Sequence, residues 1–271
     1  EKATARRPTT VAGLLDIWLA EVAAKRKPRT AYDYRRLAAR HIAPRLGRLD
    51  IVKVDRPAIA RLHHELSATP AEANHLLRVL SSFLTWAEKH GYRPDGANPC
   101  RHVTTYRETK RRRFLSGEEL ARLGAALAAA EASGAESRFV VTAVQLLVLT
   151  GCRLGEVLGA RWEWVDLEAG ELRLPDSKTG AKVVHLNAPA RAVLEALPRV
   201  AGNPHVIVGA KPGAALVNLE KPWRRIRAAA GLGDVRLHDL RHSHASVAVA
   251  GGLSLPLVGA LLGHSQPATT A

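Results

Sequence analysis

The stretch TGCRLGEVLGARWEWVDLE, residues 150–168, contains the change of pattern that decides the fold class. Before it, the apolar run at 137–149 predicts a helix, and Gly151 is typical of the point where a helix ends. A new helix is expected to begin at once, with Arg153 in its first turn. Over residues 162–187 the period changes to that of short strands separated by glycine-containing turns. This half of the chain is therefore expected to combine helices with a small antiparallel β-sheet.

The residues before this stretch predict a separate, all-helical domain. Apolar side chains recur at helical spacing in segments at 11–24, at 57–66, at 70–90 and from Thr30 onward, where Pro44 and Gly47 are expected to break the helix. Asn98 and Pro99 mark the end of these helices. The expected division is a helical domain at 8–98, a basic linker at 99–114 and a second domain at 115–271.

The charge of the chain is large and unevenly distributed. The 271 residues contain 40 lysines and arginines against 25 acidic residues, a net charge of +15. Residues 1–106 carry 19 basic and 10 acidic residues, residues 107–114 carry five and one, and the remainder is nearly balanced. An excess of this size points first to a polyanion as the partner. The basic run at 110–113 is equally consistent with a solvated linker.

Several classes of protein are disfavoured by the same sequence. The most apolar run, 139–152, is shorter than a membrane span needs and is interrupted by polar residues. No signal peptide opens the chain. Cys100 and Cys152 lack the spacing of metal ligands, which fits two incidental thiols in a reducing cytosol. Because the sequence contains no methionine, the native start is expected to lie upstream of Glu1.

Four polar motifs are hard to explain as packing. Arg153 lies where a helix begins, a position that disfavours a cation unless an anion is also bound, and Glu156 can hold its side chain. The sequence SKTG places Lys178 in a hairpin turn. His238 and Arg241 are spaced to project from one face of a helix.

The fourth motif is GHS at residues 263–265, which places His264 at the end of an apolar helix. Taken singly, the motifs have ordinary alternatives: a surface ion pair, a solvated lysine in a turn, and a histidine that interacts with a helix dipole. Taken together, two arginines, a lysine and two histidines suit the transfer of a phosphoryl group without a metal. The set lacks a nucleophile, or the carboxylates that would hold Mg²⁺.

Four segments carry a resemblance to a known family, and they are TGCRLGEVLGARWEWVDLE, SKTG, LHDLRHSHASVAVAGG and LLGHSQPATT. In order and spacing they resemble the catalytic domain of the tyrosine recombinases, the phage integrase family, over most of residues 115–271. The first domain resembles the core-binding domain of that family. The resemblance implies a mainly α chain, with an all-helical core-binding domain and an α+β catalytic domain. It also implies cleavage and rejoining of DNA through a 3′-phosphotyrosyl intermediate.

The resemblance implies a role for each polar residue. Arg153 and Arg241 would bind the scissile phosphate, and Lys178 would protonate the 5′ oxygen. His238 would act as acid and base, while His264 would hydrogen-bond the phosphate. This chemistry uses no cofactor and no metal.

The resemblance also extends to supporting groups and partners. Glu156 would support the site, and the linker cations would contact DNA, namely Lys110, Arg111, Arg112 and Arg113. The implied partner is double-stranded DNA at a recombination or attachment site, bound by a homotetramer of the full-length protein. The implied setting is the cytoplasm of a bacterium, for a phage or another mobile element.

The nucleophile of this family is a tyrosine, which by motif position would lie two residues past Ala271. All the tyrosines of the chain precede the expected catalytic domain, and they are Tyr32, Tyr34, Tyr92 and Tyr106. We therefore expect the chain that ends at Ala271 to bind the scissile phosphate without cleaving DNA, and to be capable of remaining a monomer.

Three other interpretations are compatible with the sequence. One is a DNA-binding relative that grips phosphate without catalysis. Another is a type IB topoisomerase, although the short helical domain and basic linker suit an integrase better. The third is a metal site made of His238, His242 and His244, which is disfavoured because no acidic or cysteine ligand is expected nearby.

Overall fold

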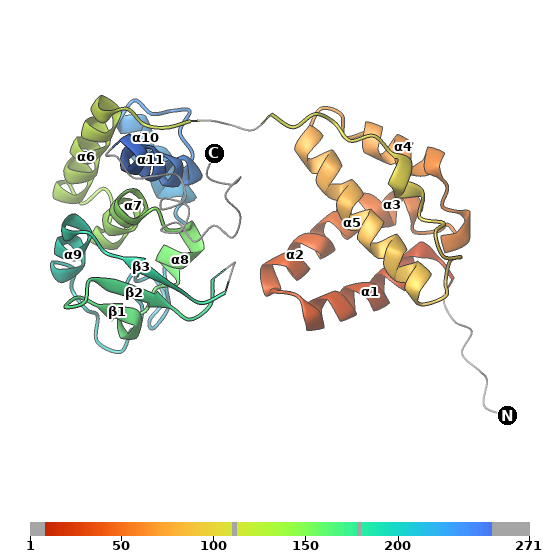
Figure 1. Ribbon diagram of the computed structural model, residues 1–271, viewed down its shortest axis with the longest axis horizontal. Helices are drawn as coiled ribbons and strands as arrows, with labels where there is room; N and C mark the ends of the chain where they lie inside the picture. The colour runs from red at the N-terminus through yellow and green to blue at the C-terminus, as the bar shows by residue number, and fades with distance from the viewer. Residues whose placement is uncertain (1–8, 110–112, 178–179, 251–271) are drawn as a thin grey trace. The chain divides into compact units, whose positions relative to one another are not determined.

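The computed structural model of the chain describes residues 9–109, 113–177 and 180–250. The chain divides into two compact units, Glu1–Lys110 and Arg111–Ala271, each with its own hydrophobic core. The first unit is built from helices, and the second combines helices with a sheet (Figure 1). This composition confirms the predicted fold class, mainly α with a small antiparallel β-sheet.

The described part of the first unit consists of α-helices and short turns of other helical types. In order they are α1 Val11–Lys25, α2 Pro28–Leu37, the π-helix η1 Ala38–Ile42, α3 Ala43–Leu46, the 3₁₀-helix η2 Ile51–Lys53, α4 Arg56–His64, α5 Pro70–Lys89 and the 3₁₀-helix η3 Pro99–His102. α1, α4 and α5 confirm the helices predicted at 11–24, 57–66 and 70–90, with small differences at their ends.

The second predicted helix does not stop at Pro44. α2 continues through η1 into α3, and the helical path ends only at Gly47. Pro44 lies in the first turn of α3, where a proline without an N–H is tolerated. The N–H of Ala43 binds the carbonyl of Ala38 across the wider π-helical turn. The expected break at Pro44 is therefore wrong.

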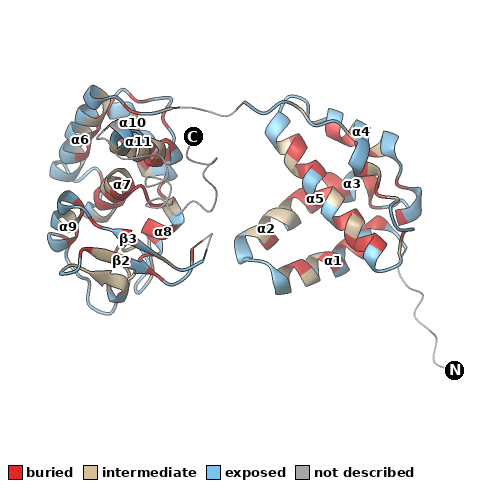
Figure 2. Ribbon diagram, in the orientation of Figure 1, coloured by how far each residue is buried: buried red, intermediate tan, exposed pale blue. Residues whose placement is uncertain are grey.

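The core of the first unit lies between α1, α2 and α5. Leu14, Phe83 and Leu84 are fully buried there. The ring of Trp18 in α1 stacks on Tyr34 at a centroid distance of 5.5 Å and lies 5.4 Å from Phe83. Buried residues line the inward sides of these helices, and exposed residues cover the outward sides (Figure 2).

The described part of the second unit combines helices with a three-stranded sheet that lies at one edge of the unit (Figure 1). Its elements are α6 Gly117–Ala132, α7 Arg138–Thr150, α8 Leu154–Leu158, the 3₁₀-helix η4 Trp162–Trp164, β1 Val165–Asp166, β2 Glu171–Leu174, β3 Lys182–His185, α9 Ala188–Glu195, α10 Glu220–Ala229 and α11 Leu237–Ala250. The strands are antiparallel in the order β1-β2-β3, with Leu172 opposite Val165 and Val184.

Local signals in the sequence fix the ends of these helices. Ser116 and Glu119 form a capping box at the start of α6. Ser137 caps α7, and Gly151 ends it with a left-handed φ of 63°. The left-handed turn at Gly151 lets α8 begin almost immediately, as predicted.

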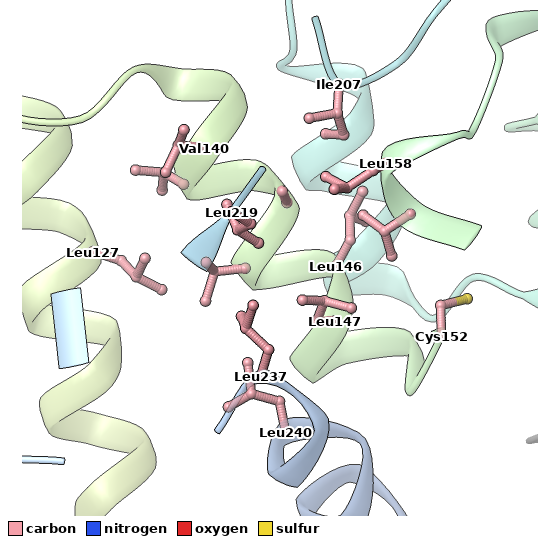
Figure 3. Packing of buried hydrophobic residues seen from close by; sticks show 14 of the residues in the cluster. Leu127, Val140, Leu146, Leu147, Cys152, Leu158, Ile207, Leu219, Leu237 and Leu240 are labelled. Atoms are coloured by element: carbon pink, nitrogen blue, oxygen red, sulfur yellow. The ribbon is translucent and has the colours of Figure 1, made fainter. Parts of the chain in front are cut away.

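α7 is the central helix of the second unit. Leu146 and Leu147 on α7 are buried, and Leu237 and Leu240 from α11 belong to the same hydrophobic cluster (Figure 3). α7 contacts both α9 and α11. Among the described residues, none of the helices has the length and apolar character needed to span a membrane.

Candidate active site

Arg153 lies directly between α7 and α8. It is the N-cap residue of α8, one position before the turn in which it was predicted. Its backbone N–H donates to Glu156 Oε2 at 2.9 Å, and its Nη1 donates to Glu156 Oε1 at 2.8 Å. The hypothesis that Glu156 holds Arg153 is therefore confirmed. The Arg153 side chain stays 24% exposed, so part of its guanidinium remains accessible.

Glu156 itself is buried and charged. Burial raises the pKa of its carboxyl, but hydrogen bonds from Lys182 and Arg153 outweigh that effect, and the net pKa is lowered. The side chain is only 7% exposed. A buried carboxylate with fixed partners is a rigid support for the arginine that it binds.

Arg241 and His238 are brought to the same place by α11. Arg241 is buried, and its Nη1 donates to the carbonyl of Gly151, the residue that ends α7. His238 is accessible to solvent, and its ring lies 4.8 Å from that of His242 in an edge-to-face arrangement. The predicted spacing of His238 and Arg241 on one helical face is consistent with this arrangement.

The charges of these side chains act on one another. Burial lowers the pKa of Arg241, and the nearby Arg153 guanidinium lowers it further. The protein packed beneath His238 lowers the pKa of its imidazole, and His242, Arg241 and Arg153 add to this effect. His238 is therefore neutral at neutral pH and can accept a proton.

A cleft of about 420 Å³ lies beside these residues. Its lining residues are Cys152, Leu154, Glu220, Trp223, Arg227, Arg236, Leu237, His238 and Arg241. Cys152 and Leu154 are the chain neighbours of Arg153. A cleft with several cations along its walls can receive an anionic group.

Three cations of this region were not predicted from the sequence, namely Lys182, Arg227 and Arg236. Lys182 on β3 donates from Nζ to Glu156 Oε2 at 2.8 Å and is only 10% exposed. Strand alternation places it on the same face as the buried Val184, so a lysine on an inward face was an available signal. For Arg236, just before α11, the only signal in the sequence was its closeness to His238. Nothing in the sequence distinguished Arg227 from the other arginines of the chain.

Several predicted site residues lie outside the described residues. These are Lys110, Arg111, Arg112, Lys178 and His264. The residues around Lys178 are described: Ser177 N–H donates to the carbonyl of Gly180 at 2.9 Å, and Gly180 has a φ of 100°. They frame the turn between β2 and β3, the place where a hairpin turn was predicted.

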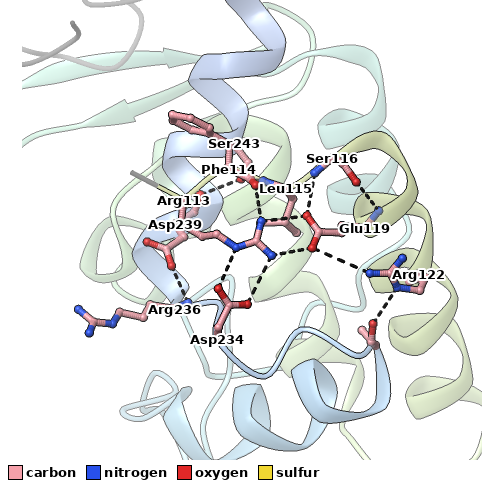
Figure 4. A network of polar contacts seen from close by, with 11 residues as sticks. Arg113, Phe114, Leu115, Ser116, Glu119, Arg122, Asp234, Arg236, Asp239 and Ser243 are labelled. Atoms are coloured by element: carbon pink, nitrogen blue, oxygen red, sulfur yellow. Dashed lines mark hydrogen bonds and ion pairs between the residues drawn. The ribbon is translucent and has the colours of Figure 1, made fainter. Parts of the chain in front are cut away.

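Arg113 is engaged within the second unit. Its Nη1 and Nη2 donate to the two oxygens of Glu119 at 2.9 and 2.6 Å, and its Nε donates to Asp234 at 3.0 Å (Figure 4). Arg113 lowers the pKa of Glu119 to about 2. Next to it, Leu115 N–H donates to Ser243 Oγ on α11 at 2.9 Å. These contacts attach the end of the predicted linker to the helix that carries His238.

The start of the same linker is attached to the first unit. Asn74 on α5 donates to the carbonyl of Tyr106 and to Glu108 Oε1, both at 2.8 Å. The ring of Tyr106 stacks on His63 at 4.5 Å. Much of the region predicted as a linker is therefore bound to one unit or the other.

The described residues contain no group of three His, Cys, Asp or Glu side chains placed to hold a metal ion. Of the three histidines considered for such a site, His244 has its Nδ1 3.0 Å from the carbonyl of Val148. His238 and His242 contact each other through their rings.

Sequence profiles of known families match both units. The profile described as the phage integrase family matches residues 113–271. The profile described as the phage integrase N-terminal SAM-like domain matches residues 10–67. The two matches fall in the second and first units, respectively.

Curated relatives are named as DNA recombinases. The chain is 26% identical to tyrosine recombinase XerD of Lacticaseibacillus casei over 225 residues, which are 77% of this chain and 73% of that protein. It is 33% identical to the shufflon-specific DNA recombinase of Escherichia coli over 121 residues, 44% of this chain and 30% of that protein. It is 31% identical to tyrosine recombinase XerC of Mycobacterium sp. (strain KMS) over 140 residues, 47% of this chain and 46% of that protein.

Solved structures share the fold. A lambda integrase dimer (residues 75–356) bound to a COC′ core site has a TM-score of 0.75 at 20% identity, covering 96% of this chain and 97% of that one. The Tn1549 transposon integrase in complex with a circular intermediate DNA has a TM-score of 0.74 at 15% identity, covering 97% and 94%. At these identities the likeness extends to the fold alone.

Proposed function

The chain belongs to the phage integrase family, and from this membership we propose that the protein is a site-specific tyrosine recombinase. It cleaves and rejoins double-stranded DNA. The observation that carries the proposal is the cleft lined by Arg241 and His238. Arg153, whose chain neighbours line the same cleft, is held by the buried Glu156 and acts electrostatically on both of these side chains.

Arg153 and Arg241 bind the scissile phosphate. Guanidinium groups bind two phosphate oxygens at once and keep their charge at any physiological pH. Both arginines are already held by the protein, so little reorganisation is needed as negative charge develops on the non-bridging oxygens. His264 donates a further hydrogen bond to the same phosphate.

The reaction transfers the phosphorus between two oxygens. The hydroxyl of the family's tyrosine nucleophile attacks the phosphorus and forms the new P–O bond, and the bond to the 5′ oxygen breaks. His238, neutral because its pKa is lowered, takes the proton of the tyrosine. Lys178 gives a proton to the departing 5′ oxygen. The 3′-phosphotyrosine is then attacked by another 5′ hydroxyl, which reverses these steps and rejoins the strand.

DNA binding extends beyond this site. The first unit and the linker region carry most of the net charge, and charge of this kind binds the DNA backbone without regard to sequence. Lys110, Arg111 and Arg112 contribute to this binding. Arg113 is left out, because its guanidinium is engaged with Glu119 and Asp234.

The assembly is a homotetramer on two duplexes when the protein is full length. One of the solved structures that shares this fold is a lambda integrase tetramer bound to a Holliday junction. The protein acts in the cytoplasm of a bacterial host, as part of a phage or another mobile element.

Covalent trapping tests the proposal. The protein with the tyrosine nucleophile of its family is mixed with a nicked suicide duplex that loses its 5′ hydroxyl after cleavage. We expect a DNA adduct that survives denaturation and is absent when the C-terminal tyrosine is replaced by phenylalanine. Tight binding without an adduct would support the non-catalytic relative instead. Relaxation of supercoils without two-site recombination would support a topoisomerase.

A further inference from the structure

Lys182 is largely buried on a strand beside the proposed active site. It is the first residue of β3 and lies opposite Leu174 in the register of the sheet. Its side chain is 10% exposed, while the next residue, Val183, is exposed to solvent. Lysines are rarely buried unless their charge is paired. The group that pairs with Lys182 therefore indicates the role of this side chain.

That partner is the carboxylate that holds Arg153. Lys182 Nζ lies 2.8 Å from Glu156 Oε2, and Arg153 Nη1 lies 2.8 Å from Glu156 Oε1. The two cations thus bind opposite oxygens and fix the plane of one carboxylate. Through it, strand β3 is connected to the N-cap of α8.

Stability alone is a weak explanation for this arrangement. Removing two charges from water offsets much of their attraction, so a buried ion pair often stabilises a fold no more than apolar residues of similar size. A fixed carboxylate, by contrast, determines where the Arg153 guanidinium lies, and a misplacement of about 1 Å in a phosphate-binding group can reduce a rate about 100-fold.

We propose that Lys182 is a positioning residue of the phosphate site, which sets the orientation of Arg153 by binding the second carboxylate oxygen of Glu156. The proposal rests on the proposed function for the role of Arg153. It assigns Lys182 no contact with the DNA and no proton transfer. It also makes strand β3 and helix α8, which follows Arg153, parts of one support.

The charges around Glu156 give the proposal a pH signature. Lys182, Arg153, Arg241 and Cys152 all face this carboxylate. Burial raises the pKa of Glu156, and the hydrogen bond from Lys182 is the largest effect that lowers it. Without Lys182 the carboxylate is protonated at a higher pH and releases Arg153. In a plot of cleavage rate against pH, the fall in rate on the acidic side is therefore expected to occur at a higher pH in a Lys182 variant.

The test compares the two lysines of the hairpin in the full-length protein, using Lys182→Met and Lys178→Met. The control is Lys211→Met, which removes an exposed lysine of the same unit. Each is assayed by covalent trapping on an ordinary duplex and on one with sulfur in place of the scissile 5′ oxygen. A thiolate leaves without needing a proton, so the sulfur substrate removes the need for a proton donor.

On the ordinary duplex we expect the cleavage rate of Lys182→Met to be about 100-fold lower than that of the wild-type protein. The loss of rate on the acidic side should also occur at a higher pH. On the sulfur substrate Lys178→Met is expected to recover, and Lys182→Met is not. Recovery of Lys182→Met would identify Lys182 as the proton donor, and an unchanged rate would give it no role. Either result overturns the proposal. Lys182→Arg, which keeps a cation and a donor, is expected to restore part of the activity and covers the case in which the methionine variant does not fold.

A second readout needs no cleavage and keeps this proposal separate from the proposed function. The side-chain N–H resonances of Arg153, assigned by their loss in Arg153→Lys, are expected to be protected from exchange in the native chain and averaged in the Lys182 variants. Unchanged Arg153 signals in both variants would contradict the positioning role, whether or not the wild-type protein cleaves DNA. Absence of any wild-type adduct contradicts the proposed function alone.

Discussion

Arg113 and Arg153 are both held by a glutamate at the start of a helix, but the two clusters differ in how their charges balance. Arg113 binds two carboxylates, Glu119 and Asp234. Glu156, in contrast, faces three cations, namely Arg153, Lys182 and, at longer range, Arg241. Two of these cations, Arg153 and Lys182, share this one carboxylate, which cannot neutralise both, so the second cluster can attract a further anion.

The difference separates an arginine that supports the fold from one that can bind a ligand. The Arg113 cluster attaches the segment before α6 to the loop before α11, and its hydrogen bonds go to carboxylates of the same unit (Figure 4). The Arg153 cluster uses its carboxylate to hold a guanidinium next to a cleft. The number of carboxylates per cation, rather than the presence of an ion pair, therefore distinguishes the two roles.

The largest expected effect is at Arg153. Arg153→Lys should reduce covalent trapping by about 100-fold or more, because a point charge cannot reproduce a guanidinium that binds two phosphate oxygens. DNA affinity, measured by fluorescence anisotropy, should change little. The matched variant Arg113→Lys should retain cleavage at a temperature where it is folded. Equal losses of cleavage in the two variants would remove the distinction between the clusters.

The next largest effect is expected in the linker. Replacing Lys110, Arg111 and Arg112 with alanine should lower the slope of log affinity against log salt concentration by up to about 3, since each phosphate contact contributes about 0.9. Arg113→Gln should leave the slope nearly unchanged. A slope that drops as much for Arg113→Gln as for one of the other three would place Arg113 on the DNA.

A smaller effect is expected on stability. Arg113→Ala should lower the free energy of unfolding by about 1–3 kcal/mol, because it leaves the partly buried Glu119 without its main partner. Arg122, which is half exposed and 3.9 Å from the same carboxylate, is the control. Arg122→Ala should change stability by less, about 1 kcal/mol at most, because it loses one hydrogen bond to the carbonyl of Ala230 and a weak surface ion pair. Urea unfolding of both variants measures the difference. Similar losses of unfolding free energy in the two variants would contradict a stabilising role for the ion pairs of Arg113.

The smallest effect is expected in the pH dependence of stability. Arg113 lowers the pKa of Glu119 from 4.5 to about 2, so this contribution is present above pH 4.5 and is lost as the pH falls toward about 2. Glu119→Gln should therefore flatten the fall of unfolding free energy over that interval. Glu118→Gln, in the same turn but exposed, should follow the wild-type curve. Identical curves for all three proteins would mean that the low pKa of Glu119 does not contribute.

Much of the fold could be predicted from local sequence. The capping box at Ser116 and the glycine at 151 fix helix ends through their own hydrogen bonds and backbone angles, so they can be recognised without tertiary contacts. Pro44 could not be predicted in this way. A π-helical turn before it widens the helix, and no residue pattern in η1 signals such a turn.

The candidate site was partly predictable for the same reason. Arg153 and Glu156 are three residues apart, and so are His238 and Arg241, so each pair follows from helical spacing. The pairing of Lys182 with Glu156 depends on how β3 packs against α8. The engagement of Arg113 depends on Asp234, far along the chain. Contacts of that kind are set by the tertiary fold. The run of four basic residues at 110–113 therefore does not show by itself which of them forms ion pairs within the protein.

Arg153, held by Glu156, is expected to act by neutralising the charge of the scissile phosphate, and a methylphosphonate duplex isolates this role. In this substrate a neutral methyl group replaces one charged oxygen at the scissile position, so less charge must be neutralised. For the full-length protein we predict that Arg153→Ala loses cleavage of the ordinary phosphate by about 100-fold or more and regains much of it on the methylphosphonate. Equal losses on both substrates would contradict the claim that Arg153 acts by neutralising phosphate charge.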